Sequence, residues 1–224
     1  MISVFNQSDI VLLTETRSEE IIDYSECFSV HRVRHVNSKR NSGSIMVFIR
    51  NTYVTDDIVF MKSEDDLFWI KINGVTVGLT DDLYIGLSYV VPEGSSRYIR
   101  NDENTFDRLI DSLAKSHQHT NSKCNIILCG DFNSRTATLA DSVPYDAVID
   151  ELGLPDDYIA DSFINRSSQD KGTTTNGQLF IDMCRQTGLR ILNGRVGNDL
   201  TIGKCTFVGS RGSSLIDYVL ASED

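Results

Sequence analysis

Two short apolar runs in the sequence each end in a group of polar side chains. Residues 10–13 (IVLL) are followed by Thr14 and Glu15, and residues 126–129 (IILC) are followed by the hexapeptide GDFNSR at residues 130–135. A short, continuous apolar run bounded by polar residues predicts a fully buried strand. Each of the two strands is therefore expected to place a carboxylate outside the core directly after it ends.

The remaining pattern alternates between strand and helix periods. Segments rich in strand-forming residues lie at 27–36, 44–51, 56–61, 67–72, 75–80, 83–90, 189–193, 204–208 and 215–221. Asn73-Gly74 separates two of these segments and favours a tight hairpin, which predicts an antiparallel meander. Apolar residues recur at helical spacing over 104–117 and 178–187, and Gly188 marks the end of the second helix. The pattern predicts an α/β (α+β) fold with two packed, mostly antiparallel sheets covered by helices.

Composition narrows the class of protein. The 224 residues are 40% apolar, which suits a single domain with a substantial core. No apolar run is long enough to cross a bilayer, and no secretory signal pattern opens the chain. The five cysteines have no paired spacing, which is typical of reduced thiols. We therefore expect an intracellular protein, nuclear or cytoplasmic, without a membrane partner.

The net charge of −11 argues against strong binding of nucleic acid through charge alone. The charge is unevenly distributed, however, because residues 27–55 contain five basic residues and no acidic one. Arg40 lies in this stretch and is a candidate substrate contact. A charged strand edge that prevents unwanted strand pairing explains the same stretch equally well.

The hexapeptide combines side chains that suit phosphate chemistry. Asp131, Asn133, Ser134 and Arg135 bring a carboxylate, an amide, a hydroxyl and a guanidinium into five residues. Together such groups can hold a phosphate next to a water molecule. The alternative is a turn in which the aspartate side chain only closes the local backbone at the strand end. The hexapeptide by itself leaves both interpretations open.

Further candidates lie outside the hexapeptide. If the two apolar strands are neighbours in one sheet, Glu15 and Asp131 meet at one rim, where carboxylate oxygens suit Mg²⁺. Asp217 lies within the apolar segment 215–220, so we expect a buried carboxylate that requires a cation, a histidine or several donors as partner. Thr206 and Ser214 could offer hydroxyls to a phosphate. Tyr89 is either a packing residue or part of the site.

Several catalytic classes are excluded by missing motifs. The sequence has no GxSxG nucleophile motif, no P-loop and no GxGxxG dinucleotide motif. No cysteine lies beside a histidine in a polar setting, which argues against a cysteine nucleophile.

Taken together, these segments resemble the endonuclease/exonuclease/phosphatase family, whose members share the deoxyribonuclease-I-like fold. The similar segments are residues 9–16 (DIVLLTET), 44–50 (SIMVFIR), Tyr89 before Pro92, 130–135 (GDFNSR) and 214–219 (SLIDYV). The resemblance covers nearly the whole chain. The LTET form and the Leu179, Gly188 and Gly194 spacing are most similar to endonuclease domains of non-LTR retrotransposons.

The resemblance implies a four-layer sandwich with the active site at one end of its two sheets. It also implies that Glu15 binds Mg²⁺, with Mn²⁺ as the alternative, and that Asp131 orients or deprotonates the attacking water. Asn133 would hold the scissile phosphate, Tyr89 would contact that phosphate or its leaving side, and Asp217 would hold a catalytic histidine. The implied reaction is in-line hydrolysis of a phosphodiester.

Three functions remain as alternatives. The first is a DNA endonuclease domain of retroelement origin, with a reverse transcriptase region in a longer parent protein. The second is a phosphatase or phosphodiesterase that acts on small or lipid phosphates, which the acidic charge favours. The third is a catalytically impaired fragment that acts as a binding module.

Two parts of the family pattern are missing from residues 1–224. The family begins with a strand that carries a metal-binding asparagine, and Asn6 lies too close to the Glu15 strand to take that place. The family ends with a Ser-Asp-His strand, whereas this sequence ends at Ser222-Glu223-Asp224. The expected unit is therefore one domain without the first and last family strands.

Overall fold

The computed structural model describes residues 5, 7–16, 28–33, 44–53, 58–61, 67–95, 105–118, 125–143, 165–210 and 212–222. The strands are β1 (Ile10–Leu13), β2 (Phe28–Val33), β3 (Ile45–Arg50), β4 (Ile58–Phe60), β5 (Leu67–Ile72), β6 (Leu83–Tyr89), β7 (Asn125–Asp131), β8 (Arg190–Ile191), β9 (Phe207–Gly209), β10 (Gly212–Ser214) and β11 (Asp217–Ala221). The two longer helices are α2 (Thr105–Gln118) and α4 (Thr175–Thr187), and the short 3-10 helices are η1 (Asn51–Tyr53), η2 (Gly74–Val77) and η4 (Gly197–Asp199).

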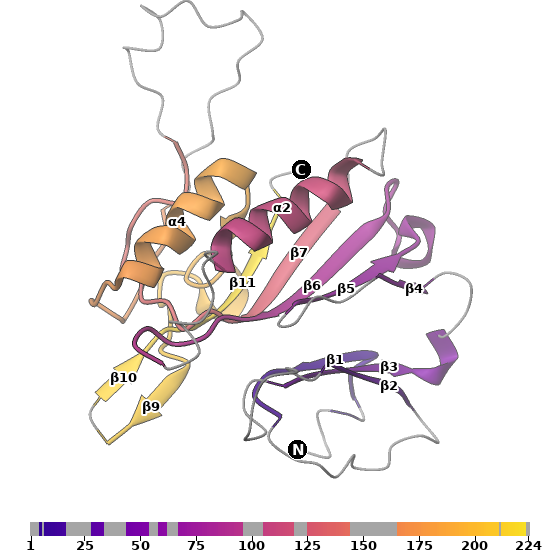
Figure 1. Cartoon of the computed structure of the whole chain (residues 1–224), viewed down its shortest axis with the longest axis horizontal. Coiled ribbons are helices and arrows are strands. Elements are labelled where there is room, and N and C mark those ends of the chain that lie inside the picture. Colours follow the sequence, from indigo (N-terminus) through magenta and orange to yellow (C-terminus); the bar gives the residue numbers. More distant parts are fainter. Residues whose placement is uncertain are drawn as a thin grey trace, which may run out of the picture.

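The larger sheet has six strands in the order β4-β5-β6-β7-β11-β8. Only β6 and β7 are parallel, and helix α2 makes the crossover that a parallel pair requires. Helices α2 and α4 cover one face of this sheet (Figure 1). Phe132 and Tyr218 pack on Phe180 of α4 at ring-centroid distances of 4.5 and 4.9 Å, so this core directly supports the strand ends.

The smaller sheet lies against the opposite face of the larger one and has the order β1-β3-β2 (Figure 1). Ile10 and Leu12 of β1 pack with Ile70 and Leu87 in a core between the two sheets. β1 and β7 are therefore not neighbours in one sheet, so the condition under which the sequence brought Glu15 and Asp131 to one rim is not met. The α/β fold class is confirmed. Phe5 packs against Phe48 on the outer face of the smaller sheet.

The predicted strand at 75–80 is wrong, because this segment forms the 3-10 helix η2 and a turn. The Asn73 side chain accepts a hydrogen bond from the Val75 amide at 3.0 Å and begins the helix, and Gly78 ends it in the left-handed conformation. Val75 is 81% exposed, so the apolar residues of this segment are not the buried face of a strand. β5 and β6 still pair antiparallel, joined by this longer connection.

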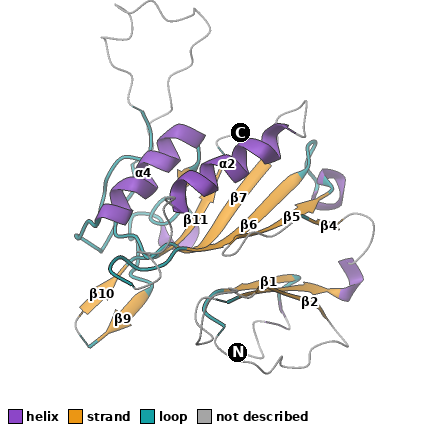
Figure 2. Cartoon of the chain, viewed as in Figure 1, coloured by secondary structure: helices purple, strands orange, loops and turns teal. Residues whose placement is uncertain are grey.

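A two-stranded hairpin, β9–β10, extends beyond the end of the larger sheet (Figure 2). It carries Phe207 and Val208, which are 52% and 79% exposed. The predicted strands at 204–208 and 215–221 both begin later than expected, at Phe207 and Asp217. No helix in the described part of the chain is both long and apolar enough to span a bilayer.

Candidate active site

Gly130 sets the position of the candidate site because it allows β7 to lie directly against β6. Its φ is 146°, and a Cβ atom there would be 1.8 Å from the Ser88 carbonyl oxygen. Only glycine tolerates both the backbone conformation and the close approach. The next residue, Asp131, therefore ends the strand in register with Tyr89.

Three predicted site residues lie side by side across neighbouring strands. Asp131 of β7 pairs with Tyr89 of the parallel strand β6 and with Asp217 of the antiparallel strand β11. Side chains alternate along a strand, and Leu87 and Cys129, two positions earlier, pack in the core between the sheets. Tyr89, Asp131 and Asp217 therefore share the face that looks towards the smaller sheet.

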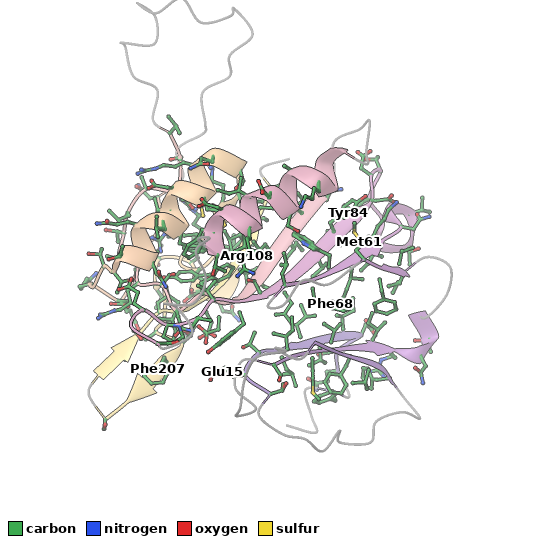
Figure 3. The ribbon with its side chains drawn as sticks, in the orientation of Figure 1. Glu15, Met61, Phe68, Tyr84, Arg108 and Phe207 are labelled. Atoms are coloured by element: carbon green, nitrogen blue, oxygen red, sulfur yellow. The ribbon has the colours of Figure 1, made fainter. Side chains whose placement is uncertain are left out.

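Glu15 reaches the same place from the smaller sheet. It follows β1 with a left-handed φ of 52°, and the Thr16 amide after it donates to the Ser44 carbonyl oxygen at 3.0 Å. The Tyr89 hydroxyl donates to Glu15 Oε1 at 3.0 Å, a hydrogen bond that joins the two sheets. Figure 3 places Glu15 at the end of the smaller sheet, on the side where the hairpin with Phe207 projects.

Asp131 has the electrostatic character of a catalytic carboxylate. It is 8% exposed, and burial raises the pKa of its carboxyl to about 7. Repulsion by Asp217 and Glu15 also raises this pKa, whereas the Asn133 backbone amide lowers it. A carboxylate whose pKa lies near neutrality can accept a proton efficiently at physiological pH.

This raised pKa predicts a pH-dependent stability difference between the wild type and Asp131→Asn. The folded-state pKa of about 7 lies above the ordinary value of 3.8, so protonated Asp131 is favoured by folding. That contribution is fully present below pH 3.8 and is lost as the pH rises through 7. We expect Asp131→Asn to be the more stable protein at pH 8, by up to about 4 kcal/mol, with little difference at pH 4.

Urea unfolding at the two pH values measures this difference directly. Asp111→Asn is the matched control because Asp111 is exposed on α2. Equal unfolding free energies for the wild type and Asp131→Asn at pH 8 would show that Asp131 is not held in a desolvated, repulsive setting.

The sequence left open whether the hexapeptide is a local turn or a phosphate site. Asn133 makes the contacts expected of both. Its backbone amide donates to Asp131 Oδ1 at 2.9 Å, so the aspartate closes a local turn as well. Asn133 has a left-handed φ of 45°, and its Nδ2 donates to the Val90 carbonyl oxygen at 2.8 Å. These contacts fix the amide beside Asp131, and strained conformations at Glu15 and Asn133 are typical of functional positions.

Ser134 and Arg135 are engaged in contacts within the protein. The Ser134 hydroxyl is fully buried and donates to the Phe132 carbonyl oxygen at 2.7 Å. The Arg135 guanidinium forms a two-point ion pair with Asp170, with Nε–Oδ2 and Nη2–Oδ1 distances of 2.9 and 2.5 Å. Both residues therefore brace the turn, and their contact with substrate stays a prediction.

Asp170 was not predicted from the sequence, yet it ties three segments together. Besides Arg135, its carboxylate accepts the Gly172 and Leu215 amides at 2.9 and 3.0 Å. Burial would raise the pKa of Asp170, but the Arg135 hydrogen bond and the two amides lower it, so the carboxylate stays charged. Its polar surroundings in sequence, SSQDKG, give no sign of burial.

Asp217 differs from expectation because it begins β11 and is half-buried, not enclosed within an apolar strand. Thr206 Oγ1 accepts hydrogen bonds from the Ile216 and Asp217 amides at 3.2 and 3.1 Å, so Thr206 supports the backbone that carries Asp217. Asn193, which was not predicted, donates through Nδ2 to the Asp217 carbonyl oxygen at 3.2 Å. Ser214 ends β10 and pairs with Phe207 in the hairpin.

The remaining predicted contacts cannot be placed. Arg40 lies outside the described residues, and so do the side chains of all four histidines of the sequence. The predicted pairing of Asp217 with a histidine therefore stays a prediction.

The donor set fits a hard divalent cation. Glu15 and Asp131 offer carboxylate oxygens, and the mutual repulsion that raises the pKa of Asp131 is what a cation would offset. Within the described ranges, no group of three or more His, Cys, Asp or Glu side chains could hold a metal ion. Mg²⁺ commonly uses one or two carboxylates and keeps several waters, so its requirement in proteins is two carboxylates or fewer.

This arrangement of two sheets, helices and a polar strand-end cluster is the deoxyribonuclease-I-like fold, which the chain shares with several solved structures. The fold implied by the sequence resemblance is therefore confirmed. No family model and no curated protein sequence matches the chain.

Three solved structures illustrate the likeness. The human Nocturnin catalytic domain with bound sulfate matches at a TM-score of 0.55 and 12% identity, over 98% of this chain and 71% of that one. ANGEL2, a 2′,3′-cyclic phosphatase, matches at 0.55 and 15% identity over the same shares. The endonuclease domain of TRAS1, a telomere-specific non-LTR retrotransposon, matches at 0.51 and 11% identity, over all of this chain and 77% of that one.

Proposed function

We propose that the chain is a Mg²⁺-dependent phosphodiester hydrolase. The observation that carries the proposal is the register of Tyr89, Asp131 and Asp217 across three strands, with Glu15 bonded to Tyr89 from the opposite sheet. Carboxylates from two sheets converge there, beside an amide that the backbone holds in place. This combination supplies a base, a cation ligand and a phosphate contact within one site.

Each residue has a role that follows from its surroundings. Asp131 accepts a proton from the attacking water, because its raised pKa makes it a base suited to neutral pH. Asn133 contacts a non-bridging oxygen of the phosphate, and its bond to Val90 keeps it oriented. Glu15 would hold the cation, since the hydrogen bond from the Tyr89 hydroxyl orients its carboxylate. The cation, Mg²⁺ or Mn²⁺, would stabilise negative charge that develops on the phosphate.

DNA is the first substrate candidate. The LTET segment and the Leu179, Gly188 and Gly194 spacing are most similar to those of non-LTR retrotransposon endonucleases, and the TRAS1 endonuclease domain shares the fold. On this proposal the chain derives from a retroelement whose parent protein also contains a reverse transcriptase region.

A small phosphate ester is the second candidate. The net charge of −11 disfavours a polyanion, and ANGEL2, whose substrate is a 2′,3′-cyclic phosphate, shares the fold. The two candidates require the same site residues and differ only in what surrounds the scissile phosphate.

Nicking of supercoiled plasmid, measured with Mg²⁺ and with EDTA, tests the proposal. We expect conversion to open circles that depends on Mg²⁺. A parallel assay with 2′,3′-cyclic nucleotides separates the two candidates. Hydrolysis of only the cyclic nucleotides would replace the endonuclease proposal with the small-ester one. Inertness towards both substrates would contradict hydrolase function and leave a binding module.

The hydrogen bond between Tyr89 and Glu15 predicts a specific metal phenotype. Tyr89→Phe removes the hydroxyl that orients the proposed cation ligand. Loss of such an orienting partner typically costs between about 10-fold and 100-fold in metal affinity. We expect the Mg²⁺ concentration for half-maximal cleavage to rise by about that factor.

Tyr84→Phe is the matched control, since Tyr84 is a buried tyrosine on the same strand, near its opposite end. If both variants needed the same Mg²⁺ concentration for half-maximal cleavage, Tyr89 would have no role at the proposed metal site.

A further inference from the structure

A second polar cavity lies apart from the carboxylate cluster. Its volume is about 580 Å³, and it is lined by Thr138, Arg166, Ser167, Ser168, Gln169, Lys171, Thr201 and Ile202. None of the proposed catalytic residues is among them. The lining residues Gln169 and Lys171 flank Asp170, which bonds to Arg135, so the cavity wall is connected to the turn after β7.

Arg166 is the unusual member of this lining. The residue is only 9% exposed, and its Nη2 donates to Thr136 Oγ1 and to the Leu139 carbonyl oxygen at 3.0 and 3.3 Å. Its Nε and Nη1 atoms are buried and have no hydrogen-bond partner in the part of the chain that the structure describes. Unsatisfied donors on a buried charged group are costly, so they indicate a place for an acceptor.

The neighbouring buried charge does not provide that acceptor. Asp141 is fully buried, but its carboxylate is bound by Arg195 at 2.5 and 2.6 Å and by the Ile191 amide at 2.8 Å. Burial accordingly lowers the pKa of Arg166, and the attraction of Asp141 offsets this only in part. Arg166 thus lines a cavity with spare donors and without a bonded carboxylate among the described residues.

We propose that this cavity binds a phosphate group. The planar guanidinium of Arg166 has two spare N–H directions, which match the paired oxygens of a phosphate. Lys171 adds an exposed ammonium group, which already donates to the Ser168 carbonyl oxygen at 2.7 Å. The hydroxyls of Thr138 and Thr201 add donors at the same wall. A cavity of this size accommodates a phosphorylated small molecule as well as a single phosphate.

The phosphate could be free or could belong to a nucleic-acid strand, and the two sources are separated by the choice of probe. We would titrate the uniformly ¹⁵N-labelled full chain, without divalent metal, with inorganic phosphate, with a 5′-mononucleotide and with a short single-stranded DNA. Amide shifts locate binding, because residues 166–171 and 201–202 report the cavity and residues 131–133 report the carboxylate cluster.

We expect every probe that binds in the cavity to change the amide chemical shifts of residues 166–171 and 201–202. Shifts with phosphate or the mononucleotide alone identify a free phosphorylated ligand. Joint shifts of both residue groups at the same DNA concentration identify a strand that crosses both sites. Shifts confined to residues 131–133, or no shifts with any probe, would overturn the proposal.

Substitutions test the two positively charged side chains of the cavity, Arg166 and Lys171. Lys171→Gln should weaken phosphate binding at the cavity about tenfold, which is the effect of one lost charge-assisted hydrogen bond. Arg166→Lys should weaken it at least as much, since lysine keeps the charge but not the planar fork. Lys115→Gln, an exposed lysine on α2, is the control and should bind like the wild type. Equal affinities for Lys171→Gln and Lys115→Gln would contradict the assignment, even if Arg166→Lys failed to fold.

Discussion

Asp131→Asn is expected to lower kcat/KM for phosphodiester cleavage by about 1,000-fold. A positioned general base typically contributes between about 100-fold and 10,000-fold, and the amide cannot accept the proton of the attacking water. The substitution preserves size and the carbonyl oxygen that closes the turn with Asn133. The loss should therefore appear in the chemical step, without loss of folding.

Asp111→Asn provides the comparison for this loss, because it makes the same chemical change at an exposed position on α2. The pH profile adds a second readout: the acidic limb of the wild type should follow the pKa of Asp131, which is about 7 without the cation and which bound Mg²⁺ lowers. Activity within a factor of about two of wild type in Asp131→Asn would exclude Asp131 as the base.

Phe132→Ala is expected to destabilise the fold by about 3–5 kcal/mol. Phe132 is completely buried, and its ring packs against Phe180 at 4.5 Å and Tyr218 at 6.3 Å between centroids. Truncation leaves a cavity under the turn that carries Asp131 and Asn133. Activity should fall together with stability, since the same packing positions both residues.

Phe207→Ala makes the same truncation where the ring is 52% exposed, on the β9–β10 hairpin. Urea unfolding should give a change within about 0.5 kcal/mol for this variant. Similar unfolding free energies for the two variants would contradict the central position of Phe132 in the core.

The sequence predicted the parts of the fold that rest on local pattern. The helix around Phe106 and Leu109 and the strand before Gly130 were predicted because apolar spacing there matches burial in the structure. Val75 shows the limit of this reasoning. The same strand-like spacing occurs on an exposed 3-10 turn, where Asn73 and Gly78 determine the backbone.

The sequence named candidate residues for the site but did not predict how they are arranged in space. The sequence brought Glu15 and Asp131 together only on the condition that their strands share one sheet, whereas they approach from two sheets that pack face to face. Asp170 and Arg166 were missed because their burial depends on long-range contacts, to Arg135 and Leu215 for one and to Thr136 and Leu139 for the other. No local pattern marks a polar residue that becomes buried only after distant segments assemble.

The central claim is that Asp131 is coupled electrostatically to Glu15 and Asp217 in one site, which a divalent cation held by Glu15 completes. A ¹³C NMR titration of the Asp131 carboxyl group, with and without Mg²⁺, tests it most directly. We predict a pKa of about 7 without the cation and a clear decrease when Mg²⁺ is added. A pKa near the ordinary 3.8 that does not respond to Mg²⁺ would contradict the claim.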